Sequence, residues 1–153
     1  MEKIAVFPGS FDPITRGHES IVHRGLSLFD RIIVALGENP DKKGYFPIDQ
    51  RIKWLEEVFQ NEKRVQIKVY HGLTVNFCNE VNASYILRGL RTAADFEFER
   101  GIGQMNKVIA PSVETVFILS YPEYSAISSS IVRDIHRHGG DISAFIPTSL
   151  KIS

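Results

Sequence analysis

The sequence has 153 residues, in which 18 Lys and Arg are balanced by 18 Asp and Glu. This balance argues against a protein that works mainly by coating nucleic acid or an anionic membrane. The one cysteine, Cys78, excludes an internal disulfide framework and a CxxC metal or redox motif. We therefore expect one domain over residues 1–153, cytoplasmic, with no nucleic-acid partner and no membrane segment.

The chain opens with a predicted strand and a shaped loop. Ile4–Phe7 is a continuous apolar run, typical of a strand covered on both faces, and Pro8-Gly9 is expected to end it. Pro13 prevents an early helix, so Gly9–Arg16 should form a loop whose backbone can approach a ligand. His18 then lies at a helix start, where unpaired N–H groups favour an anion.

Predicted helices and strands alternate along the rest of the chain. In order they are a helix carrying Ile21, Val22, Leu26 and Phe29, a strand at Arg31–Leu36, a polar loop with Lys42, a helix at Asp49–Gln60, a strand at Val65–Val69, a short helix capped by Thr74, a strand at Ser84–Leu87, a helix at Thr92–Val108, a strand at Val116–Leu119 and a helix at Ile131–His138. Because the strands are mostly continuous apolar runs, this order predicts an α/β fold. We expect a Rossmann-like, doubly wound, five-stranded parallel sheet with helices on both faces.

Polar and cationic residues follow the predicted strands, where ligands of such sheets bind. They are Gly9, Ser10 and His18 after the first strand, Lys42 after the second, Thr74 after the third, Arg88 to Arg91 after the fourth, and Ser128 to Ser130 after the fifth. The cations among them could neutralise several phosphate charges. A polyphosphate nucleotide is therefore the expected ligand.

Each of these residues also has a structural interpretation. His18 could be a capping or surface residue, Lys42 a solvated charge, Arg88 and Arg91 ion-pair partners of Asp95 and Glu99, and the three serines a helix cap. The other histidines lack the spacing of metal ligands, so no protein metal site is predicted. The coincidence of five signals at one sheet edge favours the ligand site.

Three segments resemble known signatures. Residues 9–18, which end in Thr15-Arg16-Gly17-His18, resemble the T/HxGH motif of the nucleotidyltransferase superfamily. Ile127-Ser128-Ser129-Ser130 resembles its second motif, ISSS or ISSTxxR. Arg88-Gly89-Leu90-Arg91, followed by residues 94–99, narrows the resemblance to the bacterial phosphopantetheine adenylyltransferase family over nearly the whole chain.

That resemblance implies an activity. The family transfers the adenylyl group of ATP to 4'-phosphopantetheine, giving dephospho-coenzyme A and pyrophosphate, with Mg2+ as cofactor. The attack is direct and in line, without a covalent enzyme intermediate. The resemblance also implies a homohexamer and a shared acceptor pocket through which coenzyme A could exert feedback.

The resemblance further implies roles for individual residues. The catalytic residues would be His18, Lys42 and Arg91. The ATP site would comprise Ser10, Phe11, His18, Gly89, Leu90, Arg91, Glu99, Tyr124, Ser125, Ala126, Ile127, Ser128, Ser129 and Ser130. Phosphopantetheine would be held by Ser10, Lys42, Thr74 and Arg88. Ser10 stands where many relatives have Thr, a change that keeps the hydroxyl. Mg2+ is expected to be coordinated mainly by oxygens of the polyphosphate.

Two alternatives to this function stay open. One is a related nucleotidyltransferase that acts on nicotinate mononucleotide, or on a sugar or glycerol phosphate with CTP. The other is a non-catalytic nucleotide-binding sensor, which would be expected to lack His18 or Lys42. An RNA-binding module is disfavoured by the zero net charge and the absence of aromatic-basic stripes.

Overall fold

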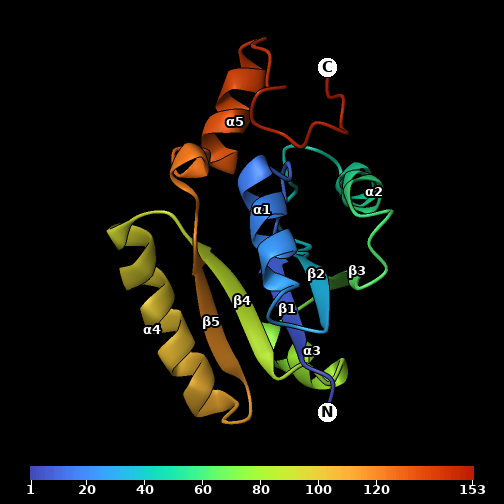
Figure 1. Ribbon diagram of the computed structural model, residues 1–153. Helices are drawn as coiled ribbons and strands as arrows, with labels where there is room; N and C mark the ends of the chain where they lie inside the picture. Colours follow the sequence, from blue (N-terminus) through green and yellow to red (C-terminus); the bar gives the residue numbers. More distant parts are fainter.

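The computed structural model describes all 153 residues, and strands and helices alternate along them (Figure 1). The elements are β1 (Ile4–Gly9), α1 (Arg16–Gly25), β2 (Arg31–Gly37), α2 (Ile48–Val58), β3 (Val65–Tyr70), α3 (Thr74–Glu80), β4 (Tyr85–Leu90), α4 (Ala93–Ile109), β5 (Glu114–Leu119), the 3-10 helix η1 (Pro122–Tyr124) and α5 (Ser129–Arg137). All five strands are parallel, in the order β3-β2-β1-β4-β5. The predicted Rossmann-like fold is confirmed.

The strand order reverses at β1, which pairs with β2 on one side and β4 on the other. The chain adds β2 and then β3 on one side of β1, and then crosses over to add β4 and β5 on the other side. The carboxyl ends of β1 and β4 flank this switch point, which is where sheets of this kind bind ligands.

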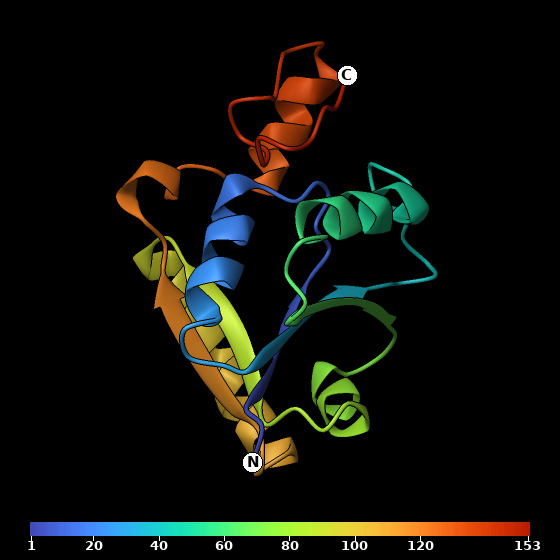
Figure 2. The same ribbon diagram turned by 45° about the vertical axis from the view of Figure 1, so that its right-hand side comes forward.

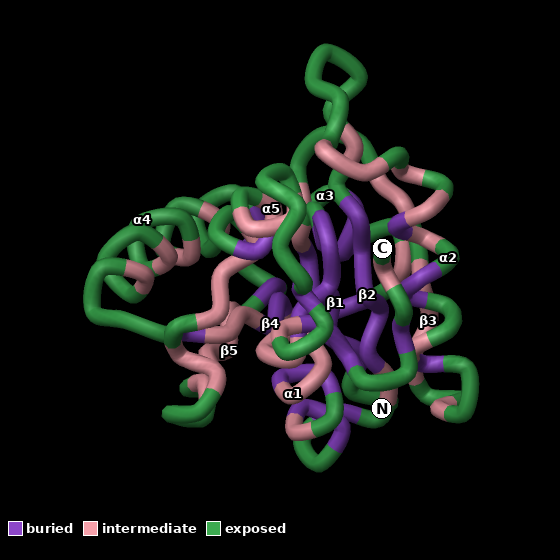
Figure 3. Tube along the Cα trace, turned by 90° about the horizontal axis from the view of Figure 1, so that it is seen from above, coloured by how far each residue is buried: buried purple, intermediate pink, exposed green.

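Helices cover both faces of the sheet, as predicted. One apolar core includes Ile21 of α1, Leu55 of α2 and Val132 of α5. A second core, on the other face, includes Phe77 of α3 and Val113 after α4. Figure 2 shows α1 and α2 on one side of the sheet and α3 on the other. In Figure 3 the central strands β1 and β2 are largely buried between these layers.

Helix α4 differs from the other α-helices because none of its residues is buried. It packs along β4 and β5 at the edge of the molecule, and most of its length is exposed in Figure 3. Phe98 and Val108 are 70% and 75% exposed, respectively. An apolar surface of this kind marks a site of association more often than a free surface.

The predicted end of the first strand at Pro8-Gly9 is wrong, because β1 pairs with β2 through Gly9, opposite Leu36. Pairing of β1 with β4 ends at Val6, and the Pro8 carbonyl points toward that side, where it accepts from Arg88 Nη1. The nitrogen of a strand residue points the same way as its carbonyl. An N–H at position 8 would therefore point toward β4, which does not pair with β1 at this point, so proline costs the sheet no hydrogen bond here.

The fourth strand is also longer than predicted. It continues through Arg88 and Gly89 to Leu90, because β5 pairs with it up to Leu119. Arg88 therefore projects from a rigid strand rather than from a loop. Gly89 allows α1 to pack closely against this strand, since a Cβ there would lie 2.9 Å from Cγ1 of Ile21.

Two predicted helix starts need correction. Leu73 is the N-cap of α3, and the Thr74 hydroxyl instead bonds to the Tyr70 hydroxyl at 2.8 Å. Helix α5 begins at Ser129 rather than Ile131, because the Ser128 side chain caps it by accepting from the Ile131 N–H. Ser129 and Ser130 therefore belong to the first turn of α5, and Ser128 is its N-cap.

The segment after α5 turns back toward the first turn of α1 (Figure 2). Arg16 holds it there: its backbone N–H donates to the Phe145 carbonyl at 2.9 Å and its Nε donates to the Ile146 carbonyl at 2.8 Å. The C-terminal residues thus steady the helix start that carries His18. None of the helices combines the length and hydropathy needed to cross a membrane.

Candidate active site

A pocket of about 430 Å3 opens at the carboxyl ends of β1 and β4. It is walled by the loop after β1, the first turn of α1, the end of β4, the start of α4 and the start of α5. The predicted site residues that line it are Ser10, Phe11, His18, Arg88, Gly89, Arg91, Glu99, Ile127, Ser128, Ser129 and Ser130. The fold therefore gathers segments from both ends of the chain around one cavity.

His18 is the third residue of α1 and completes its N-terminal cap. Thr15 Oγ1 accepts from the His18 backbone N–H at 3.3 Å, and the Thr15 backbone N–H donates to His18 Nδ1 at 3.0 Å. Because a backbone N–H can only donate, Nδ1 is the acceptor and the neutral ring carries its proton on Nε2. The predicted capping role is thus confirmed, and it leaves Nε2 free.

The free Nε2–H of His18 faces the pocket. It has no hydrogen-bond partner in the protein. Every fully buried side-chain nitrogen or oxygen of the chain has a partner, so this nitrogen is not fully buried. Burial, followed by the positive charges of Arg88 and Arg91, lowers the pKa of His18 to about 4. The ring is therefore uncharged at neutral pH and can donate one hydrogen bond to an anion without giving up its proton.

Arg88 is held by three hydrogen bonds. Its Nε and Nη2 donate to the two carboxylate oxygens of Glu99 at 3.0 and 2.6 Å, and Nη1 donates to the Pro8 carbonyl at 2.6 Å. The ion pair expected as the structural interpretation is confirmed. It uses only part of the guanidinium, whose remaining N–H groups can meet a ligand.

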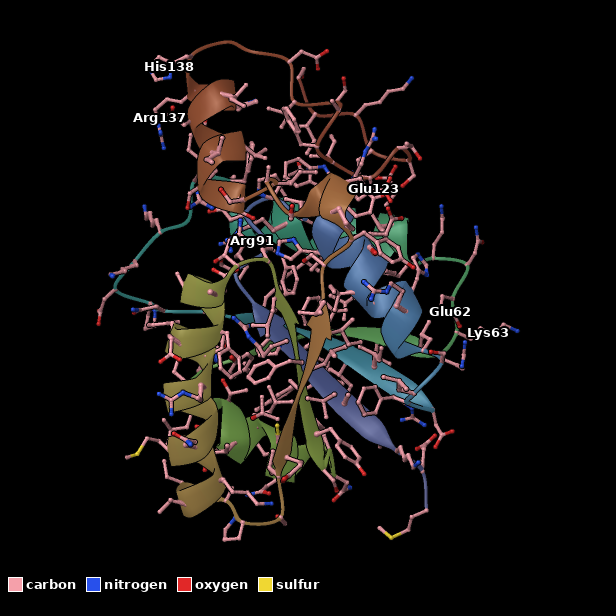
Figure 4. All side chains as sticks on the ribbon, turned by 60° about the vertical axis from the view of Figure 1, so that its left-hand side comes forward. Glu62, Lys63, Arg91, Glu123, Arg137 and His138 are labelled. Atoms are coloured by element: carbon pink, nitrogen blue, oxygen red, sulfur yellow. The ribbon has the colours of Figure 1, made fainter.

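Arg91 lies between the start of α4 and the segment that leads into α5 (Figure 4). Its Nε is 3.3 Å from Asp95 Oδ2, and its Nη1 donates to the Ile127 carbonyl at 3.2 Å. The expected ion pair is therefore confirmed here too. Arg91 joins the two segments at the rim of the pocket and keeps a positive charge there.

The serine run forms the N-terminal end of α5. Ser128 is the N-cap, the Ser129 hydroxyl donates to the Pro13 carbonyl at 3.2 Å, and the Ser130 hydroxyl accepts from Arg133 Nη2 at 3.2 Å. The bond from Ser129 ties α5 to the loop after β1, and the other two lie within the first turns of the helix. The backbone N–H groups of the first turn have no carbonyl partner within a helix, so they offer donors to an anion.

Ser10 and Phe11 occupy the loop after β1 in different ways. Ser10 is exposed and its hydroxyl has no protein partner. Phe11 is only 3% exposed, and its ring meets the His18 ring edge-on with 5.0 Å between centroids. Ser10 can therefore contact a ligand directly, while Phe11 also holds the imidazole in place.

Lys42 and Thr74 do not line the main pocket. Lys42 lines a neighbouring pocket of about 620 Å3 that shares Ser10 with the main one. Thr74 lines a third pocket of about 230 Å3, which shares Arg88 and Glu99 with the main one. The predicted site is thus divided among three adjoining hollows.

Four predicted ATP-site residues lie outside the walls of these pockets. Leu90 is 7% exposed and packed in the interior, and the Ser125 hydroxyl donates to the Pro122 carbonyl at 2.9 Å. Tyr124 is the last residue of η1, and Ala126 lies in the turn between η1 and α5. Contacts of these four side chains with ATP stay predictions.

The site contains residues that the sequence prediction did not include. Arg133 lines the main pocket, where its Nη1 donates to the Asp12 carbonyl at 2.8 Å. Asp95 and Phe98 also line it. The arginine of the ISSTxxR motif falls at position 133, so the signal for Arg133 was present in the sequence.

The carboxylates of the main pocket are both engaged by arginines. Asp95 pairs with Arg91, and Glu99 pairs with Arg88. The structure has no cluster of three or more His, Cys, Asp or Glu side chains that could hold a metal ion. The polar groups free to meet a ligand are therefore donors: an imidazole N–H, guanidinium groups, a hydroxyl and helix N–H groups.

Comparison with known proteins gives concordant results. The family model described as cytidylyltransferase-like matches residues 6–135. A protein of Cytophaga hutchinsonii named phosphopantetheine adenylyltransferase is 50% identical over 147 residues, which cover 96% of this chain and 98% of that protein. A protein of the same name from Flavobacterium johnsoniae is 47% identical over 148 residues, covering 97% of each.

Solved structures share the fold. The crystal structure of a bifunctional NMN adenylyltransferase/ADP ribose pyrophosphatase from Francisella tularensis matches with a TM-score of 0.73. The match covers 95% of this chain and 45% of that chain, at 16% identity. At this identity the likeness concerns the fold alone.

Proposed function

The chain belongs to the cytidylyltransferase-like family and, within it, to the phosphopantetheine adenylyltransferases, and from this membership we propose what each pocket residue does. The reaction transfers the adenylyl group of ATP to 4'-phosphopantetheine, giving dephospho-coenzyme A and pyrophosphate. It belongs to coenzyme A biosynthesis. The enzyme is a nucleotidyltransferase.

The observation that carries the proposed mechanism is the free Nε2–H of a neutral His18 beside Arg88 and Arg91. The acceptor phosphate is already an anionic nucleophile, so the reaction needs no general base. Its difficulty is to bring two anions together and to stabilise the charge that grows on the α-phosphate. His18 does the second by donating from Nε2 to an α-phosphate oxygen as that phosphorus becomes five-coordinate.

The leaving group is held on the side opposite to the attack. An oxygen of the acceptor phosphate forms a bond to the α-phosphorus while the bond from that phosphorus to the α,β-bridging oxygen breaks. The pyrophosphate takes the electron pair of the broken bond. Arg91, Arg133 and the N-terminal end of α5 stabilise its charge, which is supported by their common position around the main pocket.

In this proposal the acceptor occupies the two neighbouring hollows, one lined by Lys42 and the other by Thr74. Lys42 and Arg88 bind its phosphate, and Ser10 contacts both substrates because it borders two of the pockets. The pantetheine arm runs along Thr74. Coenzyme A carries the same arm, so it would compete for this hollow and could act as a feedback inhibitor.

Magnesium enters with ATP in this proposal. The ion prefers oxygen ligands, keeps several bound waters and is coordinated by substrate phosphates. This fits a pocket whose carboxylates, Asp95 and Glu99, are already paired with arginines. When bound, Mg2+ neutralises part of the polyphosphate charge. The protein groups orient the phosphates around it.

The same proposal includes a homohexamer and a cytoplasmic location. The exposed apolar residues of α4, among them Phe98, Met105 and Val108, support association with further copies. Both statements extend the resemblance to the family.

An acceptor panel tests the proposed substrates. Purified protein would be incubated with Mg2+, ATP or CTP, and one of 4'-phosphopantetheine, nicotinate mononucleotide or glycerol 3-phosphate. Pyrophosphate release and product mass would be followed, with the reverse reaction run in pyrophosphate. We expect dephospho-coenzyme A from ATP and phosphopantetheine alone. Faster release with another acceptor, or none with any, would contradict the proposal.

A further inference from the structure

Asp12 and Arg51 are the two charged residues of this chain that are buried, at 5% and 7% exposure. Neither has a part in the mechanism above. Burying an ion pair seldom stabilises a fold more than apolar residues of similar size would. Their position between two loops of the site suggests a different reason for their presence.

Asp12 ties the loop after β1 to the loop after β2. Its Oδ2 accepts from the Tyr45 backbone N–H at 2.7 Å, and its Oδ1 accepts from the Phe46 backbone N–H at 2.9 Å. Tyr45 and Phe46 close the loop that carries Lys42. One carboxylate next to Ser10 therefore fixes the end of the Lys42 loop.

Arg51, on α2, binds the main chain of both loops. Its Nη1 donates to the Ser10 carbonyl at 2.8 Å, and its Nε donates to the Phe46 carbonyl at 2.9 Å. The same Nε lies 3.9 Å from Asp12 Oδ1, so the charges are paired without a direct hydrogen bond. The guanidinium makes these bonds from two nitrogens held in one plane, a geometry that the single nitrogen of a lysine does not reproduce.

Gly44 packs directly on this pair. A Cβ at position 44 would lie 2.7 Å from Arg51 Nη2 and 2.9 Å from Asp12 Oδ2. The backbone two residues after Lys42 is thus in contact with both charged groups. We call Asp12, Arg51 and Gly44 the loop clasp.

We propose that Asp12 and Arg51 are positioning residues, which set the separation between the Ser10 hydroxyl and the Lys42 ammonium and thereby place the acceptor phosphate. This inference rests on the proposed roles of Ser10 and Lys42. In-line transfer needs the attacking oxygen at a defined distance and angle from the α-phosphorus. A displacement of about 1 Å can lower the rate about 100-fold.

The test compares variants of the clasp with a matched arginine elsewhere. Arg51→Gln removes the clasp, Arg51→Lys keeps its charge, and Gly44→Ala displaces it without removing a charged group. Arg64→Gln is the control, because Arg64 Nη1 also donates to a backbone carbonyl, that of Leu26, away from the pockets. All are assayed for kcat and for KM of each substrate, at a temperature where circular dichroism shows them folded.

We expect Arg51→Gln to lower kcat/KM for phosphopantetheine about 10- to 100-fold while KM for ATP stays within about 3-fold. Arg51→Lys should be nearly as impaired, and Gly44→Ala should shift the same constants in the same direction. Arg64→Gln should change none of them more than about 2-fold. Equal changes in both KM values, or rescue by Arg51→Lys, would overturn the inference. If Arg51→Gln does not fold, Gly44→Ala alone decides it.

Two further measurements separate this inference from the proposed function. If the clasp acts through Lys42, the loss caused by Lys42→Ala should be smaller in the Arg51→Gln background than in the wild type. If Lys42→Ala lowers the rate by the same factor in both backgrounds, the inference about the loop clasp is wrong. If Lys42→Ala alone has no effect, the proposed role of Lys42 fails instead. In that case hydrogen exchange of the Tyr45 and Phe46 backbone amides, measured in ligand-free protein, tests whether the clasp holds the loop. Unchanged protection of these amides in Arg51→Gln would contradict the inference.

Discussion

At the scale of single residues, His18 shows how a structural and a catalytic role can coincide. Its Nδ1 accepts from the Thr15 backbone, which fixes both the ring orientation and the tautomer. The same bond leaves Nε2 as a donor directed into the pocket. The capping interaction therefore orients the ring and keeps its proton on Nε2, from which it can donate to a phosphate oxygen.

The tautomer and charge of His18 can be observed directly. Its lowered pKa favours the deprotonated ring, so between pH 6.5 and about 4 this histidine should stay neutral while ordinary histidines become charged. In ligand-free protein we expect 15N imidazole spectra to show the Nε2–H form of His18 down to about pH 4. Titration near pH 6.5, or an Nδ1–H form, would be inconsistent with the geometry.

Arg91 should act mainly on ATP. It lies at the rim of the main pocket, next to Ile127 and away from the hollow that contains Lys42. We expect Arg91→Ala to raise KM for ATP about 10-fold or more, because a charge-assisted bond to phosphate is worth roughly 1.5–3 kcal/mol. KM for phosphopantetheine should change little. Impaired acceptor use with unchanged ATP dependence would reverse this assignment.

At the scale of elements, the start of α1 is the critical structure. Thr15 caps the helix with its hydroxyl, and Arg16 ties the same turn to the C-terminal segment. The position of His18 therefore depends on two independent restraints. The end of β4 is held in a comparable way by the bonds of Arg88 to Glu99 and to Pro8.

Removing the cap should loosen this turn. Thr15→Ala deletes the hydroxyl that accepts from the His18 N–H, and loss of an N-cap typically costs about 1 kcal/mol. We expect urea unfolding to show a loss of about that size, with a fall in kcat because His18 is held less firmly. Thr15→Ser keeps the hydroxyl and should retain most of both. A Thr15→Ala protein of full stability and activity would rule out the cap as a restraint.

At the scale of the whole molecule, the five-stranded parallel sheet could be predicted because buried parallel strands are mostly continuous apolar runs, whereas the strand order is known only from the structure. The strand ends could not, since Pro8 and Arg88 belong to strands only through pairing with residues distant in the sequence. Sequence motifs also located His18 and the serine run. They could not reveal Arg51, because a buried guanidinium on a helix reads like any surface arginine until the loops it binds are placed.

The exposed face of α4 leads to a prediction about assembly. Six chains of 17.3 kDa would give a particle of about 104 kDa by light scattering. Val108 is 75% exposed on α4, so Val108→Asp should place a charge in the contact and reduce the mass. Leu28→Asp, at a residue 53% exposed in the turn after α1, serves as the control. A monomeric wild-type protein would contradict the assembly.

Adenylyl transfer in the proposed mechanism depends on the neutral His18 donor, and a single-turnover assay of His18→Ala measures this dependence. An excess of wild-type or variant enzyme, with Mg2+ and saturating 4'-phosphopantetheine, would be mixed with a limiting amount of ATP, and dephospho-coenzyme A would be followed over time. Removal of one such donor should slow the chemical step about 100- to 1,000-fold, with ATP binding and fold retained. A folded His18→Ala protein with a near-normal rate of transfer would show that the reaction does not need this donor.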